Sequence, residues 1–95
     1  MTRKSGRYAE GLRERLRDPA YAADYLTAAA DEGRDELLLA LRDVARAHGM
    51  TRVAKQAQRG RESLYKALSK GGNPGLETVL SVLDAVNLEL RFAAK

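Results

Sequence analysis

Two short apolar patterns, separated by a few polar residues, constrain the fold of this chain more than any other segment. They lie between Thr51 and Ser69, in the sequence TRVAKQAQRGRESLYKALS. The apolar residues are spaced so that two helices can bury one side of each together: Val53, Ala54, Ala57, Leu64 and Leu68. We therefore predict two short helices joined by a tight turn over about residues 51–69.

The remaining positions of this segment are polar and mostly basic. Arg, Gln, Ser, Tyr and Lys side chains at the start of a second helix suit base edges and phosphates in the major groove of DNA. Arg61 is suited to donate two hydrogen bonds to guanine, and Glu62 to accept one from cytosine. The alternative is a charged helix face that only solvent contacts. The residues predicted to contact DNA are Arg52, Gln56, Arg59, Arg61, Glu62, Ser63, Tyr65 and Lys66.

Basic charge is concentrated in two stretches, although the whole chain of 95 residues has a net charge of only +4. Residues 1–17 hold six Lys or Arg against two acids, and residues 49–75 hold six against one. Residues 18–48, in contrast, hold three against seven. Clustered basic charge of this kind is typical of proteins that bind nucleic acids.

The composition argues against several kinds of chemistry. The chain has no cysteine and a single histidine, His48, so we expect no disulfide and no metal site. No nucleophile–base pair or phosphate-binding glycine loop is recognisable, and we predict neither enzymatic activity nor a cofactor. No apolar run approaches the roughly 18 residues of a membrane span. Without a secretory signal either, we expect no membrane partner and a cytoplasmic location.

Hydrophobic periodicity divides the chain into two parts. Residues 1–17 form a basic N-terminal arm that is partly helical, and residues 18–95 form one helical DNA-binding domain. Asp18 followed by Pro19 predicts the start of a helix, because aspartate caps the first turn and proline fits the first helical position. Gly33 is expected to end this helix.

Further helices flank the pair at residues 51–69. One is predicted from Asp35 to His48, and Thr51 is expected to cap the helix that follows. A final helix is predicted from about residue 74 or 75 to Val86, with Asn87 as its left-handed terminator. Its expected buried residues are Leu76, Val79, Leu80, Leu83 and Val86.

Near the end of the chain, Leu88, Leu90 and Phe92 alternate with Glu89, Arg91 and Ala93. This period predicts a half-buried strand at about residues 88–93. A single strand cannot satisfy its own backbone groups, so it must pair with a second copy or with a strand of a partner. We favour a homodimer formed through Leu88, Leu90 and Phe92. The alternative is a tail that packs on the last helix as extended coil.

The second half of the chain resembles a known family. The sequence TRVAKQAQRGRESLYKALSKGGNPGLETVLSVLDAVNLEL resembles the Xre/Cro-type helix-turn-helix domain and, more narrowly, the HigA-like addiction module antidote proteins. The motifs are RESLYKALS at 61–69, GNP at 72–74, and a set in the last helix: Leu76, Thr78, Val79, Val82, Leu83, Asp84 and Ala85. The resemblance covers roughly residues 8 to 92.

The resemblance implies a function. Such proteins are usually antitoxins that neutralise a small RelE-like toxin and repress their own operon as dimers, which here implies a palindromic operator in double-stranded DNA. Some related proteins act as regulators without a toxin. An acidic group in the first half of the chain is available to a basic toxin, or is simply a solvated surface: Asp24, Asp31, Glu32, Asp35 and Glu36.

The turn between the two helices departs from the family pattern. Gln58, Arg59 and Gly60 stand where the family usually has Gly, a hydrophobic residue and Ser. Either Gln58 takes the positive φ of the usual glycine, at a cost of about 1 kcal/mol, or Gly60 takes it in a turn shifted by one residue. An arginine cannot replace the buried hydrophobic residue unpaired. We therefore expect a less rigidly held recognition helix, with Arg59 reaching a phosphate.

These observations predict an all-α fold: a five-helix Xre/Cro-like helix-turn-helix domain with an N-terminal helical extension and a short C-terminal β-strand. The predicted function is a sequence-specific repressor that is also the antitoxin of a type II toxin–antitoxin module. The alternatives are a stand-alone Xre-type regulator and a protein-interaction module whose DNA binding has decayed.

Overall fold

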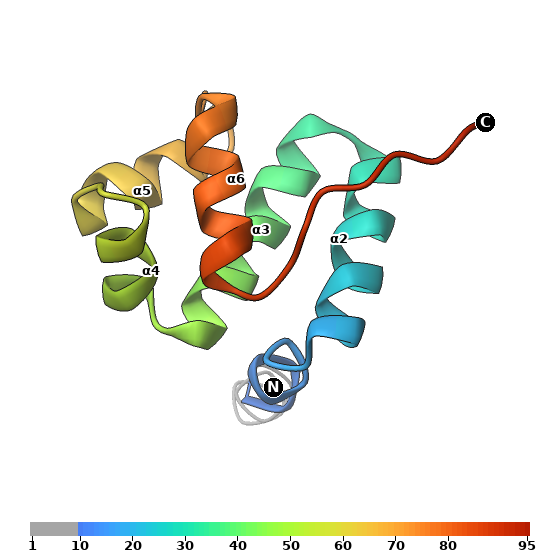
Figure 1. Cartoon of the computed structure of the whole chain (residues 1–95), viewed down its shortest axis with the longest axis horizontal. Helices are drawn as coiled ribbons and strands as arrows, with labels where there is room; N and C mark the ends of the chain where they lie inside the picture. Colours follow the sequence, from blue (N-terminus) through green and yellow to red (C-terminus); the bar gives the residue numbers. More distant parts are fainter. Residues whose placement is uncertain (1–9) are drawn as a thin grey trace, which may run out of the picture.

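Helices contain most of the residues that the structure describes. The computed structural model describes residues 10–95, in which α2 spans Pro19–Glu32, α3 Arg34–His48, α4 Met50–Gln56, α5 Arg61–Ala67 and α6 Leu76–Ala85 (Figure 1). Residues 10–15 are also helical, so this part of the chain has six helical segments. The all-α class agrees with the prediction, whereas the predictions made for residues 1–9 lie outside the described residues.

α2 begins and ends where local chemistry predicts. The carboxylate of Asp18 accepts a hydrogen bond from the N–H of Ala20 at 3.2 Å, and Pro19 is the first helical residue. Gly33 ends the helix with a φ of 143°, a conformation that is open to glycine because it lacks a Cβ atom. The chain reverses at this residue, and α2 packs along α3 (Figure 1).

α3 is the central helix of the core. It packs against α2 on one side and against α4 on the other. Many of its core residues are small, which lets the neighbouring helices approach closely. Its buried residues are Leu38, Ala40, Leu41, Val44, Ala45 and Ala47.

α4 begins before the residue that was predicted to cap it. Gly49 has a φ of 100° and Met50 is the first residue of the helix. Met50 is buried in the core, so the earlier start places a large apolar side chain inside the protein. Thr51 is an exposed residue within the helix, and its prediction as a cap is wrong.

The predicted C-terminal strand is also wrong, because residues 10–95 contain no strand. Asn87 ends α6 with a φ of 64°, as predicted, and the N–H of Leu88 donates to the carbonyl of Leu83 at 2.8 Å. The tail then runs as an extended segment past α3 toward α2 (Figure 1). A strand needs a second extended segment to receive its hydrogen bonds, and the described chain offers none.

α6 packs through part of the predicted side: Leu83 and Val86 are buried and Val79 packs against the core, as predicted. Thr78 is buried, with 4% of its surface exposed, whereas Leu76 and Leu80 are 67% and 43% exposed. The prediction that these two leucines are buried is therefore wrong. The helix is rotated so that Thr78 faces the neighbouring α4–α5 turn, which leaves the two leucines outside.

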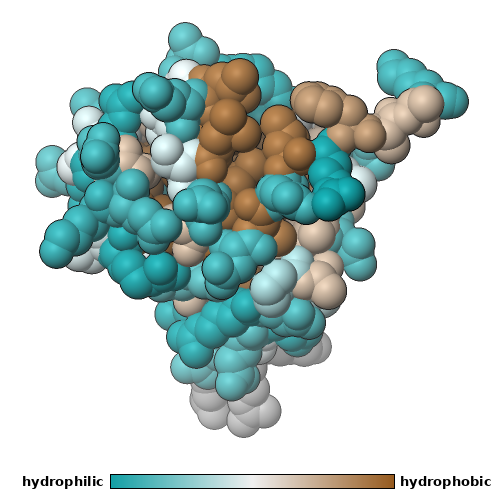
Figure 2. Space-filling model, in the orientation of Figure 1, coloured by the Kyte–Doolittle hydropathy of each residue, from teal (hydrophilic) through white to brown (hydrophobic). Residues whose placement is uncertain are grey.

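The exposed leucines of α6 continue into the C-terminal tail. Leu90 and Phe92 are 48% and 92% exposed, and with Leu76 and Leu80 they form what we call the apolar face. Figure 2 shows apolar residues gathered over α6 and along the tail, with hydrophilic residues around them. A groove of about 450 Å³ lies on the same side, lined by residues of α2, α3, α6 and the tail.

Two kinds of feature are missing from the part of the chain that the structure describes. None of its helices combines the length and the apolar character needed to cross a membrane. No three His, Cys, Asp or Glu side chains of residues 10–95 gather as the ligands of a metal ion would.

Candidate nucleic-acid interface

α4 and α5 are held together by a shared buried side. Val53 of α4, Leu64 of α5 and Leu68 just after α5 have no exposed surface. A helix of seven residues is not stable by itself in water, so α5 depends on this packing. Full burial of one leucine stabilises the fold by about 1.5–3 kcal/mol. Two short helices joined by a turn are therefore present, as predicted.

The turn adopts the first of the two predicted geometries. Gln58 has the positive φ, at 56°, while Gly60 has an ordinary extended conformation with a φ of −68°. The N–H of Gln58 donates to the carbonyl of Lys55 at 3.1 Å, and the N–H of Arg59 donates to that of Ala54 at 2.9 Å. Gln58 thus accepts the left-handed conformation at a cost of about 1 kcal/mol.

Arg59 anchors the turn to α6. Its Nη2 atom donates to Oγ1 of Thr78 at a distance of 2.8 Å, and Thr78 is a buried residue. Because Arg59 is itself exposed to solvent, we expect this hydrogen bond to contribute about 0.5–1.5 kcal/mol to stability. The sequence indicated that an arginine at this position needs a partner, but it gave no sign that Thr78 would be that partner.

The start of α5 presents polar side chains to solvent. Arg61, Glu62, Ser63 and Lys66 are exposed, and Tyr65 is half-buried against the core. The guanidinium carbon of Arg61 lies 5.7 Å from the centre of the Tyr65 ring, within the range of a cation–π attraction. The structure thus brings five predicted DNA-binding residues onto one helix and places one guanidinium group against an aromatic ring.

The two predicted residues of α4 have different surroundings. Arg52 donates through Nη2 to the carbonyl of Ala85 at 3.1 Å and through Nε to that of His48 at 3.4 Å. It therefore caps the C-terminal end of α6, where a cation is favourable. Gln56 is exposed at the end of α4. Contact of Arg52, Gln56 and Arg59 with DNA stays a prediction.

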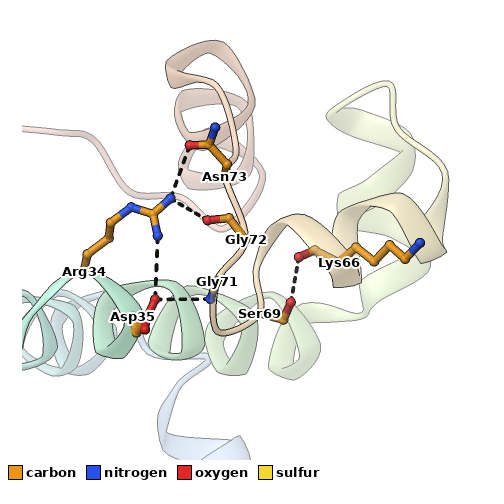
Figure 3. A network of polar contacts seen from close by, with 7 residues as sticks. All are labelled: Arg34, Asp35, Lys66, Ser69, Gly71, Gly72 and Asn73. Carbon is orange, nitrogen blue, oxygen red and sulfur yellow. Dashed lines mark hydrogen bonds and ion pairs between the residues drawn. The ribbon is translucent and has the colours of Figure 1, made fainter.

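A polar network holds the loop after α5 to the start of α3 (Figure 3). Arg34 donates to the carbonyl of Gly72 and to Oδ1 of Asn73, and Oδ1 of Asp35 accepts from the N–H of Gly71 at 3.2 Å. A Cβ atom at Gly72 would clash with the backbone carbonyls at the end of α5, so only glycine fits there. The far end of α5 is fixed by this network.

Comparison with known proteins identifies the family. The family described as "Probable addiction module antidote protein" matches residues 10–94. The chain belongs to this family. An uncharacterized protein of Haemophilus influenzae is 47% identical over 68 residues, which are 70% of this chain and 70% of that protein. No solved structure matches the chain.

Membership in the antidote family supports an antitoxin role, and that role implies a toxin partner of some kind. The resemblance to antidote proteins is thereby confirmed. The narrower resemblance to HigA-like proteins with an Xre/Cro-type helix-turn-helix stays a prediction, because the match defines the antidote family alone.

The hydrogen bond between Arg59 and Thr78 can be measured with a double-mutant cycle. We expect Arg59→Ala and Thr78→Val to show a coupling free energy of about 0.5–1.5 kcal/mol in urea unfolding, because each variant removes one partner of the same bond. The matched control pairs Thr78→Val with Lys55→Ala, an exposed cation of α4, and should show no coupling. Equal coupling in both cycles would contradict the anchoring role of Arg59.

Proposed function

We propose that this member of the antidote family is a sequence-specific repressor and the antitoxin of a type II toxin–antitoxin module. In this proposal α5 is the recognition helix of a helix-turn-helix. Two copies of the chain place their α5 helices in successive major grooves of a palindromic operator and exclude polymerase from the promoter. The protein autoregulates its own operon in the cytoplasm.

The outward face of α5 is the observation that supports DNA binding most strongly. Burial of Leu64 and Leu68 turns Arg61, Glu62 and Lys66 toward solvent at one end of the helix–turn–helix unit. Donors and acceptors held on a helix of fixed orientation suit the base edges of a major groove. The segment around this helix, residues 49–75, also holds six Lys or Arg against one acid, which favours a polyanionic partner.

Each side chain of the face has a proposed role. Arg61, oriented by Tyr65, donates to a guanine edge, and Glu62 accepts from a cytosine amino group. Lys66 neutralises a phosphate, and Ser63 donates to a phosphate or a base. The Tyr65 ring contacts the sugar–phosphate backbone or a thymine methyl group.

Residues outside α5 complete the proposed contact with DNA. Gln56 and Arg52 of α4 lie on the helix that crosses the backbone in this class of motif. Arg59 has further N–H groups besides the one that Thr78 accepts, and these are proposed to reach a phosphate.

A second copy of the chain is the proposed occupant of the apolar face. A two-fold interface uses the same surface on both copies, so it must offer a protruding group and a place to receive it. Phe92 protrudes from the tail, and the groove of about 450 Å³ lies on the same side, lined in part by Leu26, Leu37 and Val79. Leu88 and Leu90 belong to the lining of the groove and directly precede Phe92 in the tail. This homodimer would form through packing rather than through a paired strand.

A regulator without a toxin is the competing function, and the neighbouring reading frame distinguishes the two. A small basic RelE-like product of about 100 residues that co-purifies with this chain would support the antitoxin role. Its absence would support a stand-alone regulator. The acidic α2–α3 surface, with Asp24, Asp31 and Glu32, is the proposed contact for a basic toxin.

DNA binding is tested by gel-shift titration on the DNA upstream of the chain's own reading frame. We expect Arg61→Ala to weaken operator binding by about 1–3 kcal/mol and to relax the preference at one base pair, because a bidentate base contact is lost. Lys66→Ala should weaken binding to all sequences and lower the salt slope by about 1.8, because one phosphate contact worth about 0.9 is lost from each of the two bound copies.

The matched control for this experiment is Arg15→Ala. Arg15 carries the same charge as Arg61 and lies over the ring of Tyr21 as Arg61 lies over that of Tyr65, but it is outside both the α4–α5 pair and the groove. Its removal should leave selectivity unchanged. If neither Arg61→Ala nor Lys66→Ala differs from Arg15→Ala, the proposed repressor is wrong and a protein-interaction module is favoured.

Homodimerisation is tested by sedimentation equilibrium. We expect Phe92→Ser to raise the dimer dissociation constant at least about tenfold, which corresponds to about 1.4 kcal/mol, because the two-fold dimer loses two aromatic anchors that commonly contribute more than 1 kcal/mol each. Phe92 is almost fully exposed in the single chain, so its replacement should not unfold the protomer. Tyr21→Ser is the control, since Tyr21 is a partly exposed aromatic outside the groove lining. A monomeric parent chain, or equal dissociation constants, would contradict the interface.

A further inference from the structure

A second group of arginines lies outside the α4–α5 pair. Arg13 and Arg17, which precede α2, and Arg46, from the last turn of α3, line one hollow of about 410 Å³ together with His48 and Gly49. All three arginines are exposed. We call this group the arginine cluster.

One backbone contact explains why these arginines meet although they are distant in the sequence. The Nε atom of Arg17 donates to the carbonyl of Ala47 at 3.0 Å. This bond fixes the segment before α2 against the end of α3, beside Arg46. The contact uses a single N–H of the guanidinium group, so the other donors of Arg17 are available to a ligand.

No acid of the described residues forms an ion pair with the arginine cluster. The ion pairs found in residues 10–95 are Arg34 with Asp35 and Arg91 with Glu89. Asp43 lines an adjoining hollow with Arg13 and Arg46 but forms an ion pair with neither, and its Oδ2 atom instead accepts a hydrogen bond from the hydroxyl of Tyr25 at 2.7 Å. Guanidinium groups that converge without a counter-ion attract anions, and their forked donors match the oxygens of a phosphate.

His48 forms an uncharged wall of the same hollow. Burial lowers the pKa of its imidazole, and the charges of Arg52 and Arg17 lower it further, against a hydrogen bond with the backbone of Leu16 that raises it. The imidazole is therefore neutral near pH 7, and the positive charge of the hollow resides on its guanidinium groups.

The position of the cluster indicates which phosphates it can reach. The hollow ends at Gly49, the residue directly before α4. In helix-turn-helix proteins the first helix of the pair crosses the DNA backbone, so groups next to its start lie beside phosphates at the edge of the half-site. We propose that Arg13, Arg17 and Arg46 bind backbone phosphates that flank the half-site read by α5. This inference rests on the proposed function and extends the DNA footprint beyond the α4–α5 pair.

The salt dependence of operator binding by the full chain tests this inference. We expect the double variant Arg13→Gln, Arg46→Gln to lower the slope of log K against log salt by about 3.6, since each phosphate contact accounts for about 0.9 and the variant removes two contacts from each of the two copies on the operator. The ratio of operator to non-specific affinity should stay the same, because phosphate contacts carry no sequence information. Arg17 is kept, because its bond to Ala47 supports the fold.

Two matched variants control for net charge and for folding. Arg15→Gln with Lys95→Gln removes the same charge at exposed sites that lie outside both the hollow and the groove of the proposed dimer. This pair should leave the slope close to that of the parent chain. Arg13→Lys with Arg46→Lys keeps the charge and should retain most of the parent slope. Circular dichroism on each variant confirms that the helices are intact.

The outcomes separate this inference from the proposed function. If the parent chain binds its operator selectively but the two glutamine pairs have the same slope, the flanking contact is wrong and the repressor stands. If the parent chain binds no DNA, both are wrong. If the Arg13→Gln, Arg46→Gln variant binds the operator with the salt slope of the parent chain but no longer binds a co-purifying protein, the cluster is a protein site and the inference is overturned.

Discussion

The burial of Leu64 and Leu68 is the interaction on which the rest of the structure depends. α5 has seven residues and would not remain helical alone, so its existence and its orientation both come from these two leucines. Once they are inside, the helical period leaves Arg61, Glu62 and Lys66 outside. The same packing that stabilises the core therefore determines which chemical groups the protein can offer to a partner.

α6 connects the face of α5 to the apolar face. On one side, Thr78 accepts a hydrogen bond from Arg59, and the carbonyl of Ala85 accepts one from Arg52. On its other side it exposes Leu76 and Leu80. If two copies associate through the apolar face, α6 sets the distance between their proposed recognition helices. It does so because α6 is fixed to the α4–α5 pair on one side and forms part of the apolar face on the other. That arrangement would give the half-site spacing of an operator a direct structural origin.

The sequence was sufficient where local chemistry decides the structure. Asp18 with Pro19 and the glycine at position 33 define α2, and the apolar spacing around Leu64 defines the α4–α5 pair. The sequence was insufficient where a contact with a residue distant in the chain determines the structure. The rotation of α6 depends on Thr78 meeting Arg59, and the alternation after Asn87 resembles a strand but finds no second extended segment. The arginine cluster joins segments about 30 residues apart, as in the bond from Arg17 to Ala47, so no local pattern could have predicted it.

The most direct measurement is a nitrogen-15 NMR titration of the full chain with a duplex of the proposed operator, which locates any surface that contacts the DNA residue by residue. We expect the largest shifts in α5 at residues 61–66, smaller shifts around Gly49 and Arg46, and little change in the exposed surface of α2. This pattern would place the DNA on the exposed side of α5, opposite the buried Leu64 and Leu68. Shifts confined to α2 and the tail, with α5 unchanged, would contradict it.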